Sequence, residues 1–214
     1  VYMGAQKENI HIGVNTVDMD CFRREVIKFR NSATFIEERP KFPKILFLYV
    51  GQLIKRKGVF QILNGLSKMN NPDIGLLIVG NGPLEQELKR FCHSQGLTNV
   101  FFMGFKQQDE LPKYYALADI FILPSFEEVW GLVVNEALAS GLYVLCSNKA
   151  GAAYDLIREQ WNGRIFDPYD ENGIVEIIQE TVKNVEEIKI RRPLISNHAC
   201  QEFSIQRSAR AFLD

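Results

Sequence analysis

The sequence predicts an α/β protein built on a Rossmann-like, doubly wound parallel sheet of about six strands. Two observations lead to this prediction. Short, uninterrupted apolar runs recur along the chain, as expected of strands that are buried on both faces. Each run is followed by a glycine-containing turn and then by a stretch with helical spacing, which is the alternation found in parallel βαβ units. The expected strands lie near residues 45, 74, 100, 119, 142 and 164.

Composition limits the classes of function that the chain could have. Its 214 residues, of which 46% are hydrophobic, are enough for one well-buried domain. The formal net charge of −1 provides no general attraction to nucleic acid, so no nucleic-acid partner is expected. Four widely separated cysteines suggest neither a disulfide framework nor a zinc site and favour a cytoplasmic location. We find no signal peptide and no apolar run long enough to span a bilayer.

The first part of the chain is expected to contain a short strand at 9–15 and one helix over 20–38. Between them, Asp18 and Asp20 form an Asp-x-Asp pattern of the kind that can bind a metal ion. Both residues also suit the start of a helix, where carboxylates accept hydrogen bonds from free backbone amides. We prefer this second interpretation, because three-residue patterns arise often by chance.

The strand expected at 45–50 ends in a glycine loop, 51–58, that carries three consecutive basic residues before Gly58. This loop has neither the spacing of a Walker phosphate loop nor the three glycines of a dinucleotide fingerprint. From the residues alone, Lys57 and its two neighbours are either a solvated basic turn or contacts for an anion.

Two further turns follow expected strands. The strand at 74–79 ends in Gly80-Asn81-Gly82-Pro83, ahead of a helix from about 84 to 94. The absence of a third glycine at fingerprint spacing argues against NAD binding. The strand at 99–103 leads into Gly104-Phe105-Lys106 and then a helix at about 109–117. From the residues alone, the position of Phe105 is also compatible with a core residue.

The central stretch, 124–137, follows the expected strand 119–123 and enters a helix that reaches about Ser140. Glu128 lies in its loop and Glu136 in its helix, and at 1.5 Å of rise per residue their carboxylates could reach points about 10 Å apart. The backbone amides at 129–132 should be unpaired at the start of this helix, which makes an anion site. Alternatively, both glutamates are solvated helix charges.

The remaining chain completes the pattern, with strands expected at 142–146 and 163–168, two or three helices after them, and a last helix over about 204–213. In a parallel sheet, the loops at 51–58, 80–83, 104–106 and 128–131 all leave the carboxyl ends of their strands. We therefore expect these four loops to converge on one crevice.

The central stretch resembles a known family. Pro124-Ser125, then Glu128, an aromatic residue before Gly131, and Glu136-Ala137 eight residues after the first glutamate are similar to the signature of retaining glycosyltransferases of family 4. These enzymes have a GT-B fold, and the signature belongs to its C-terminal, donor-binding domain. Further similarities lie in Asn15, Val17-Asp18, Phe22, the Lys57-Gly58 pair and the Gly80 turn. The resemblance extends from about Asn9 to the end of the chain.

The resemblance implies roles for individual residues. Lys57 would stabilise the departing diphosphate of a nucleotide sugar, Glu128 would hold hydroxyls of the transferred sugar or steady positive charge on its ring, and Glu136 would hold the ribose. Lys57 and Glu128 are thus the catalytic candidates. The other donor-binding candidates are Gly51, Gln52, Gly80, Phe105, Lys106, Val129, Trp130, Gly131 and Leu132. Trp130 is expected to act by packing.

The family also sets expectations about ligands. The donor would be UDP- or GDP-linked, with no metal or other cofactor required. The family usually has Arg where this chain has Gln52, which can donate a hydrogen bond but cannot neutralise phosphate charge. Lys55 or Arg56 are candidates to compensate.

By the same resemblance, residues 1–43 would be a linker strand and helix, 44–203 the nucleotide-sugar-binding domain, and 204–214 a helix that braces an N-terminal acceptor domain. A sugar or glycolipid acceptor would be bound by that further domain, with peripheral association of the full-length protein at the inner face of a membrane. The fragment alone is expected to be inactive. Two alternatives stay open: a GT-B sugar-nucleotide epimerase, and a non-catalytic binding or scaffold module.

Overall fold

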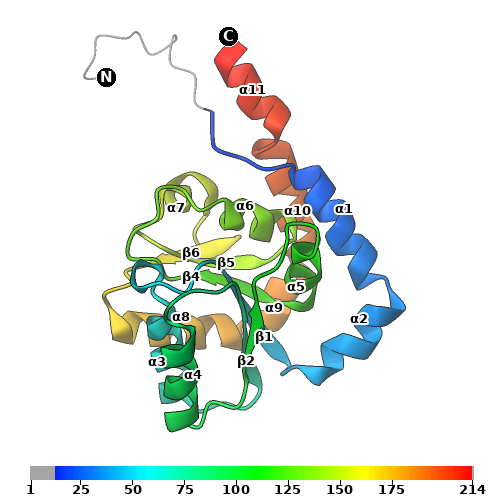
Figure 1. The fold of residues 1–214 in the computed structure, drawn as a ribbon. Helices are drawn as coiled ribbons and strands as arrows, with labels where there is room; N and C mark the ends of the chain where they lie inside the picture. Colours follow the sequence, from blue (N-terminus) through cyan, green and yellow to red (C-terminus); the bar gives the residue numbers. More distant parts are fainter. Residues whose placement is uncertain (1–12, 214) are drawn as a thin grey trace, which may run out of the picture.

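The computed structural model describes residues 13–213, which form a central sheet covered by helices on both faces (Figure 1). The sheet has six parallel strands in the order β3-β2-β1-β4-β5-β6. This confirms the predicted doubly wound architecture. The strands are β1 (Ile45–Val50), β2 (Ile74–Val79), β3 (Val100–Gly104), β4 (Ile120–Leu123), β5 (Tyr143–Ser147) and β6 (Gly163–Phe166).

The strand order reverses between β1 and β4, which are neighbours in the sheet although two strands separate them in the chain. Their register pairs Phe47 with Ile120 and Leu48 with Phe121. Connections to β2 and to β5 leave this pair in opposite directions, so a crevice opens at the carboxyl ends of β1 and β4. Ligands of doubly wound folds bind at such a switch point.

Helices α3, α4 and α8 pack together on one face of the sheet, and α1, α5, α6 and α10 pack together on the other (Figure 1). The helical elements are α1 (Met19–Arg30), α2 (Ala33–Glu38), η2 (Arg39–Lys41), η3 (Lys55–Lys57), α3 (Val59–Met69), α4 (Glu85–Ser94), α5 (Leu111–Leu117), α6 (Leu132–Ala139), α7 (Gly151–Leu156), α8 (Glu171–Lys183), α9 (Val185–Ile190), α10 (Arg192–Glu202) and α11 (Ile205–Leu213).

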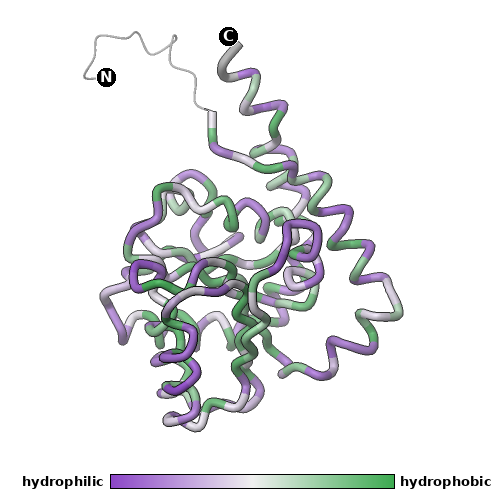
Figure 2. Tube along the Cα trace, viewed as in Figure 1, coloured by the Kyte–Doolittle hydropathy of each residue, from purple (hydrophilic) through white to green (hydrophobic). Residues whose placement is uncertain are grey.

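The core is formed by the strands and the inner faces of these helices. Every residue of β2, β4 and β5 is buried, as the uninterrupted apolar runs predicted. Helix α1 also joins the core, through Met19, Phe22 and Val26. Figure 2 shows the hydropathy pattern that results, with hydrophobic strands in the middle and mixed colouring along the outer helices.

The prediction of one helix over 20–38 is wrong, because the chain breaks after α1 and a second helix begins at Ala33. Ser32 adopts an extended backbone conformation, and its side chain accepts a hydrogen bond from the Phe35 amide at 3.2 Å. Serine is favoured at this position before a helix because its hydroxyl satisfies one of the free amides. Apolar spacing alone did not reveal the break.

The strand expected at 9–15 falls partly outside the described residues, and its described part, 13–15, is irregular. Next to it, Asp18 precedes α1 and accepts a hydrogen bond from the Cys21 amide at 2.9 Å, as expected of a helix cap. Within residues 13–213, no group of three His, Cys, Asp or Glu side chains is close enough to hold a metal ion.

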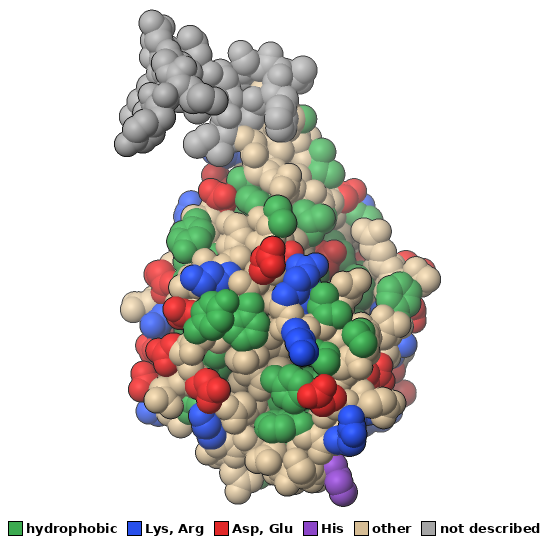
Figure 3. All heavy atoms as spheres, turned by 60° about the vertical axis from the view of Figure 1, so that its left-hand side comes forward, with side chains coloured by type: hydrophobic (Ala, Val, Ile, Leu, Met, Phe, Trp, Pro, Cys, Tyr) green, Lys and Arg blue, Asp and Glu red, His purple; other side chains and the backbone are tan. Residues whose placement is uncertain are grey.

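Charged side chains of both signs are interspersed over the face drawn in Figure 3, with apolar side chains between them. Such a surface lacks the clustered basic patch that is typical of nucleic-acid-binding proteins. Among the described residues, none of the helices combines the length and the apolar character that crossing a membrane would require.

Candidate functional site

The loops that follow β1 and β4 meet at the switch point in direct backbone contact. Gly58 has a φ of +68°, and a Cβ atom there would lie 2.1 Å from the Pro124 carbonyl oxygen. Both the conformation and the contact therefore require glycine. Close by, the Phe126 amide donates a hydrogen bond to the Arg56 carbonyl at 2.8 Å. The basic loop and the central stretch are thus held together as one unit.

The loops after β2 and β3 join this unit through further backbone hydrogen bonds. The Leu53 amide donates to the Asn81 carbonyl at 2.9 Å, and the Gly80 amide donates to the Gly104 carbonyl at 2.8 Å. All four loops predicted to converge therefore lie at one edge of the sheet. The contact explains the glycine at position 80, because a Cβ there would lie 2.0 Å from the Gly51 carbonyl oxygen.

A cavity of about 230 Å³ opens between the first three of these loops. Most of its exposed surface is apolar, and the aromatic ring of Phe105 is more than half exposed beside it. Five of the predicted donor-binding residues share this cavity with apolar strand ends and Asn81. Its lining is Val50, Gly51, Gln52, Val79, Gly80, Asn81, Phe105, Lys106 and Leu111.

On the other side of the switch point, Lys57 and Glu128 form an ion pair between their ammonium and carboxylate groups. The two side chains are only 13% and 15% exposed. The sequence had assigned them separate roles and had not predicted this pairing. Because an ammonium carries three donor hydrogens, Lys57 can hold Glu128 and still donate to another oxygen.

The start of α6 lies next to this ion pair. Gly131 precedes the helix with a φ of +99°, and no side chain caps the helix. In the described structure the amides at 129–132 donate no hydrogen bond to any protein group. They are therefore free donors at the positive end of a helix dipole, which is the arrangement that binds anions.

Glu136, one turn into α6, is 7% exposed and accepts a hydrogen bond from the Tyr115 hydroxyl at 2.7 Å. Burial raises the pKa of this carboxyl group, although the Tyr115 hydrogen bond opposes the shift. Only one of its two oxygens is engaged by the residues that the structure describes. Sequence reasoning missed Tyr115, which lies in α5 and whose only signal was a polar ring in an apolar helix.

Trp130 packs against the core, as expected, and also makes a polar link. Its indole Nε1 donates to the Asn135 side chain at 3.1 Å, and Asn135 in turn donates to the Asn15 carbonyl at 3.1 Å. The free amides of the central stretch are thereby connected to the segment that leads into α1. Asn135 was not singled out in the sequence, although it is fully buried and so required partners.

Tyr49 supports the loop after β1 through a hydrogen bond from the hydroxyl of its buried ring. It is fully buried in β1, and its hydroxyl donates to the Gln52 carbonyl at 2.8 Å. Burial is the main reason that the pKa of this hydroxyl is raised. A tyrosine inside an otherwise apolar strand needs such a partner, and this requirement was the signal that could have identified it.

The family model for glycosyl transferases group 1 matches residues 32–198, which include all four loops. The chain belongs to this family. Solved structures of glycosyltransferases share its fold. Anabaena HepE, determined with UDP and glucose, superposes with a TM-score of 0.76 at 20% identity, over 98% of this chain and 57% of HepE.

Two further similar proteins show how the length of this chain compares with theirs. The C-terminal domain of the group 1 protein LpcC from Francisella tularensis superposes with a TM-score of 0.71 at 21% identity, covering 89% of this chain and 100% of that domain. An uncharacterized glycosyltransferase of Methanocaldococcus jannaschii is 30% identical over 72% of this chain. The aligned region is 39% of the archaeal protein, so the chain spans well under two thirds of the length of that relative.

Proposed function

We propose that this chain binds the nucleotide-sugar donor of a retaining glycosyltransferase, and that the whole protein transfers the sugar to an acceptor. The observation that carries the proposal is the free amide cluster at 129–132 beside the Lys57 ammonium. Together they offer a diphosphate several hydrogen-bond donors and one ammonium group, whose side chain is only 13% exposed. Membership of the group 1 family supports the same conclusion.

In this proposal, the diphosphate lies between Lys57 and the start of α6. Negative charge on the diphosphate grows as the bond to the anomeric carbon breaks, and fixed donors stabilise that charge without having to reorganise. The Lys57–Glu128 ion pair holds the ammonium in place before the donor arrives. Because Lys57 is already oriented, less entropy is lost when it contacts the phosphate.

Glu128 would contact the transferred sugar through the carboxylate oxygen that does not face Lys57, or steady positive charge that develops on the ring. Glu136 would accept a hydrogen bond from the ribose on the oxygen that Tyr115 leaves free. The transferred sugar would keep its anomeric configuration. The acceptor, a sugar or glycolipid, would come from outside the described residues, in the synthesis of a polysaccharide, lipopolysaccharide or glycoconjugate.

The apolar cavity beside Phe105 and Lys106 would hold the nucleobase. Its walls suit a flat ring, and Lys106 at its rim is the one ionisable group among its lining residues. The presence of UDP in the HepE structure supports UDP as the first ligand to test. Gln52, in the position of the family's usual Arg, lines the same cavity and would give a weaker phosphate contact than a cation.

Titration calorimetry of this chain with UDP, GDP, ADP and NAD tests the proposal. We expect one nucleoside diphosphate to bind and NAD not to bind. Lys57→Ala should weaken that binding by about 10- to 100-fold, since it removes a charge-assisted contact. Glu136→Ala should also weaken it.

Lys68→Ala is the matched control, because Lys68 lies near the far end of α3 from Lys57 and forms an exposed pair with Glu171. It should leave the affinity unchanged. Two results would contradict the proposal. One is that neither the chain nor the full-length protein binds any nucleotide, and the other is that the Lys57 and Lys68 variants bind with equal affinity.

A further inference from the structure

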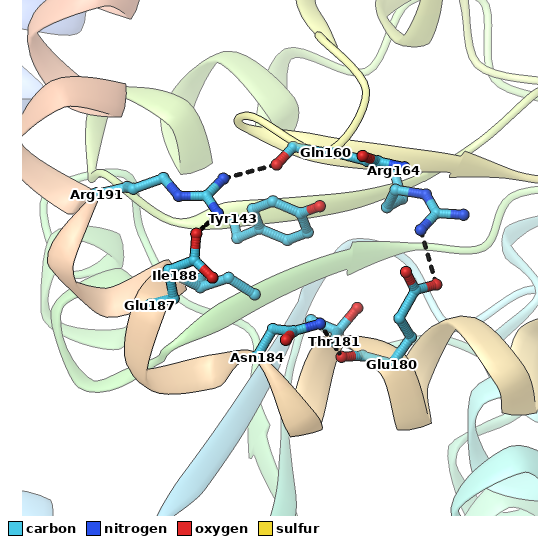
Figure 4. Close-up of a pocket in the computed structure, with 9 residues that line it drawn as sticks. All are labelled: Tyr143, Gln160, Arg164, Glu180, Thr181, Asn184, Glu187, Ile188 and Arg191. Carbon is cyan, nitrogen blue, oxygen red and sulfur yellow. Dashed lines mark hydrogen bonds and ion pairs between the residues drawn. The ribbon is translucent and has the colours of Figure 1, made fainter.

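A second cavity, of about 190 Å³, lies at the opposite edge of the sheet from the loops described above (Figure 4). Tyr143 is the first residue of β5, and Arg164 is the second residue of β6. The central stretch instead follows the last residue of β4. At about 3.3 Å per residue, the length of β5 places roughly 13 Å of strand between the two edges. The cavity is therefore separate from the candidate donor site.

One hydroxyl that lines this cavity has no protein partner among the described residues. Tyr143 is 5% exposed, and its ring lies in the middle of the cavity lining in Figure 4. Its hydroxyl makes no hydrogen bond with the protein groups that the structure describes, and it is not one of the fully buried polar atoms, so it is open to the cavity and to water. A hydroxyl whose partner is water alone is available to a ligand that displaces this water. Burial raises the pKa of Tyr143 to about 12, which keeps the hydroxyl protonated and able to donate.

Two ion pairs flank the tyrosine ring from opposite sides (Figure 4). Arg191 pairs with Glu187 and also donates to the Gln160 carbonyl at 2.6 Å. Arg164 pairs with Glu180 at 2.7 Å, and its Nε lies 3.0 Å from a Glu159 carboxylate oxygen without making a hydrogen bond. The walls of the cavity are therefore built from groups whose charges are already matched.

The charge balance of these walls selects against anions. Two guanidinium groups and two carboxylates line the cavity, so its charged lining has a formal charge of zero, and Glu159 lies beside Arg164 outside the lining. A phosphate or carboxylate ligand would find no unpaired positive charge here, because each arginine already holds a glutamate. The Thr181 and Asn184 side chains, from α8, add neutral donors and acceptors to the lining.

The size of the cavity limits the ligand to a small molecule. Its volume corresponds to roughly six water molecules at about 30 Å³ each. It falls below the range of about 300–1,000 Å³ that is typical of pockets for drug-sized ligands. A nucleotide is therefore too large, whereas one sugar ring with its hydroxyls is of suitable size.

We propose that this cavity binds a neutral monosaccharide unit, at a second carbohydrate site distinct from the donor site. Each sugar hydroxyl both donates and accepts, which matches walls that alternate guanidinium, carboxylate, amide and hydroxyl groups. The Tyr143 ring and the Ile188 side chain offer apolar surface to the carbon face of the ring. Tyr143 Oη is the group that exchanges water for a sugar hydroxyl when the sugar binds.

Amide chemical-shift mapping of the chain tests this site. The probes are methyl α-D-glucopyranoside and methyl α-D-mannopyranoside at up to tens of millimolar, with inorganic phosphate and ethanolamine as the anionic and cationic alternatives. We expect at least one of the two glycosides to shift the amides of 160–164 and 181–191. Phosphate and ethanolamine should leave these amides unshifted.

Tyr143→Phe removes only the hydroxyl and should weaken glycoside binding roughly 3- to 10-fold, the range for one neutral hydrogen bond. Tyr154→Phe is the matched control, because Tyr154 is 70% exposed and its hydroxyl donates to the Asn148 carbonyl. It should leave the affinity unchanged.

Three results would overturn the proposal. In the first, neither glycoside shifts these amides. In the second, phosphate or ethanolamine shifts them and the glycosides do not. The third is a glycoside response confined to 51–58 and 128–132, which would assign sugar binding to the donor site alone. Since the donor site is tested with nucleotides, failure of either proposal leaves the other standing.

Discussion

The two ends of β4 carry carboxylates in opposite states. Asp119, just before the strand, is 3% exposed, and both of its oxygens are engaged. Oδ2 accepts from Arg39 at 2.9 Å and from the Leu46 amide at 2.8 Å, and Oδ1 accepts from Arg192 at 2.6 Å. At the other end, Glu128 pairs with Lys57 while the amides that follow it have no partner in the described structure.

This difference separates a charge that is bound within the fold from a region that still has free donors. The Asp119 cluster joins η2, β1 and α10, and both carboxylate oxygens of Asp119 are bound to groups of those elements, so this carboxylate holds them together. The Lys57–Glu128 region keeps donors available. In a sheet of this kind, unused hydrogen-bonding groups at the carboxyl edge indicate where a ligand completes the structure.

The largest effect should come from Asp119→Ala. This change leaves Arg39 and Arg192 without their buried partner, and breaking a buried ion pair on one side typically costs about 3–5 kcal/mol of stability. Chemical denaturation of the purified variant measures this loss. The nucleotide affinity of the molecules that remain folded should not change, because Asp119 lies at the other end of the strand.

Asp73→Ala provides the comparison, since Asp73 pairs with Lys44 on the surface with both side chains more than half exposed. An exposed pair contributes about 0–1 kcal/mol. Similar losses in the Asp73 and Asp119 variants would show that the buried cluster does not hold the fold together.

A smaller effect should distinguish two glycines with nearly the same backbone conformation. Gly58 and Gly96 have φ values of +68° and +66°, but a Cβ at Gly96 would meet nothing within 4 Å. Gly96→Ala should therefore lose only the cost of the left-handed conformation, about 1–2 kcal/mol. Gly58→Ala adds a clash with the Pro124 carbonyl. Overpacking of this kind typically costs a further ~1–3 kcal/mol of stability.

Gly58→Ala should also reduce nucleotide binding, because it forces apart the two loops that carry Lys57 and Glu128. Urea denaturation and calorimetry of both variants measure the two effects. If Gly58→Ala retained full nucleotide affinity, the contact between these loops would not be needed for the site.

The third prediction concerns pH and Glu136. Burial raises its pKa in the native state above the value of about 4.3 in an unfolded chain. Between those two values the native state binds more protons than the unfolded state, so stability falls as the pH rises through this range. In Glu136→Gln this contribution is absent, and the variant should gain stability relative to the unmodified chain as the pH rises.

Nucleotide binding should follow the opposite trend, because the ionised carboxylate is the better acceptor for ribose hydroxyls. Denaturation and calorimetry at a series of pH values check both directions. Parallel stability curves for the two proteins across this pH range would mean that Glu136 titrates alike in the folded and unfolded chains.

The sequence predicted the sheet well, because its information is local. The runs at 45–50 and 74–79 match β1 and β2 to the residue, since a parallel strand buried on both faces is visible as an unbroken apolar segment. The expected convergence of the four loops followed from chain topology. The break at Ser32 is also local, but its capping role was masked by apolar spacing that continued across it.

Side-chain partners were less predictable, because they depend on residues far apart in the chain. Asp119 is bound by groups 73 to 80 positions away. The Lys57–Glu128 pair spans 71 positions, and the Glu136–Tyr115 bond joins separate helices. Such pairings depend on three-dimensional proximity. The individual roles assigned to the predicted site residues stay predictions until the nucleotide titrations are made.

The hydrogen bonds that link the segment before α1 to the segment around α11 have a consequence for protein engineering. Ser208 donates to the Val14 carbonyl at 2.9 Å, and Thr16 donates to the Phe203 carbonyl. The backbone therefore reaches and leaves the sheet-containing body at one shared junction (Figure 1). A body whose two connections are adjacent can be exchanged between proteins as a cassette, since a single patch has to be matched at the graft.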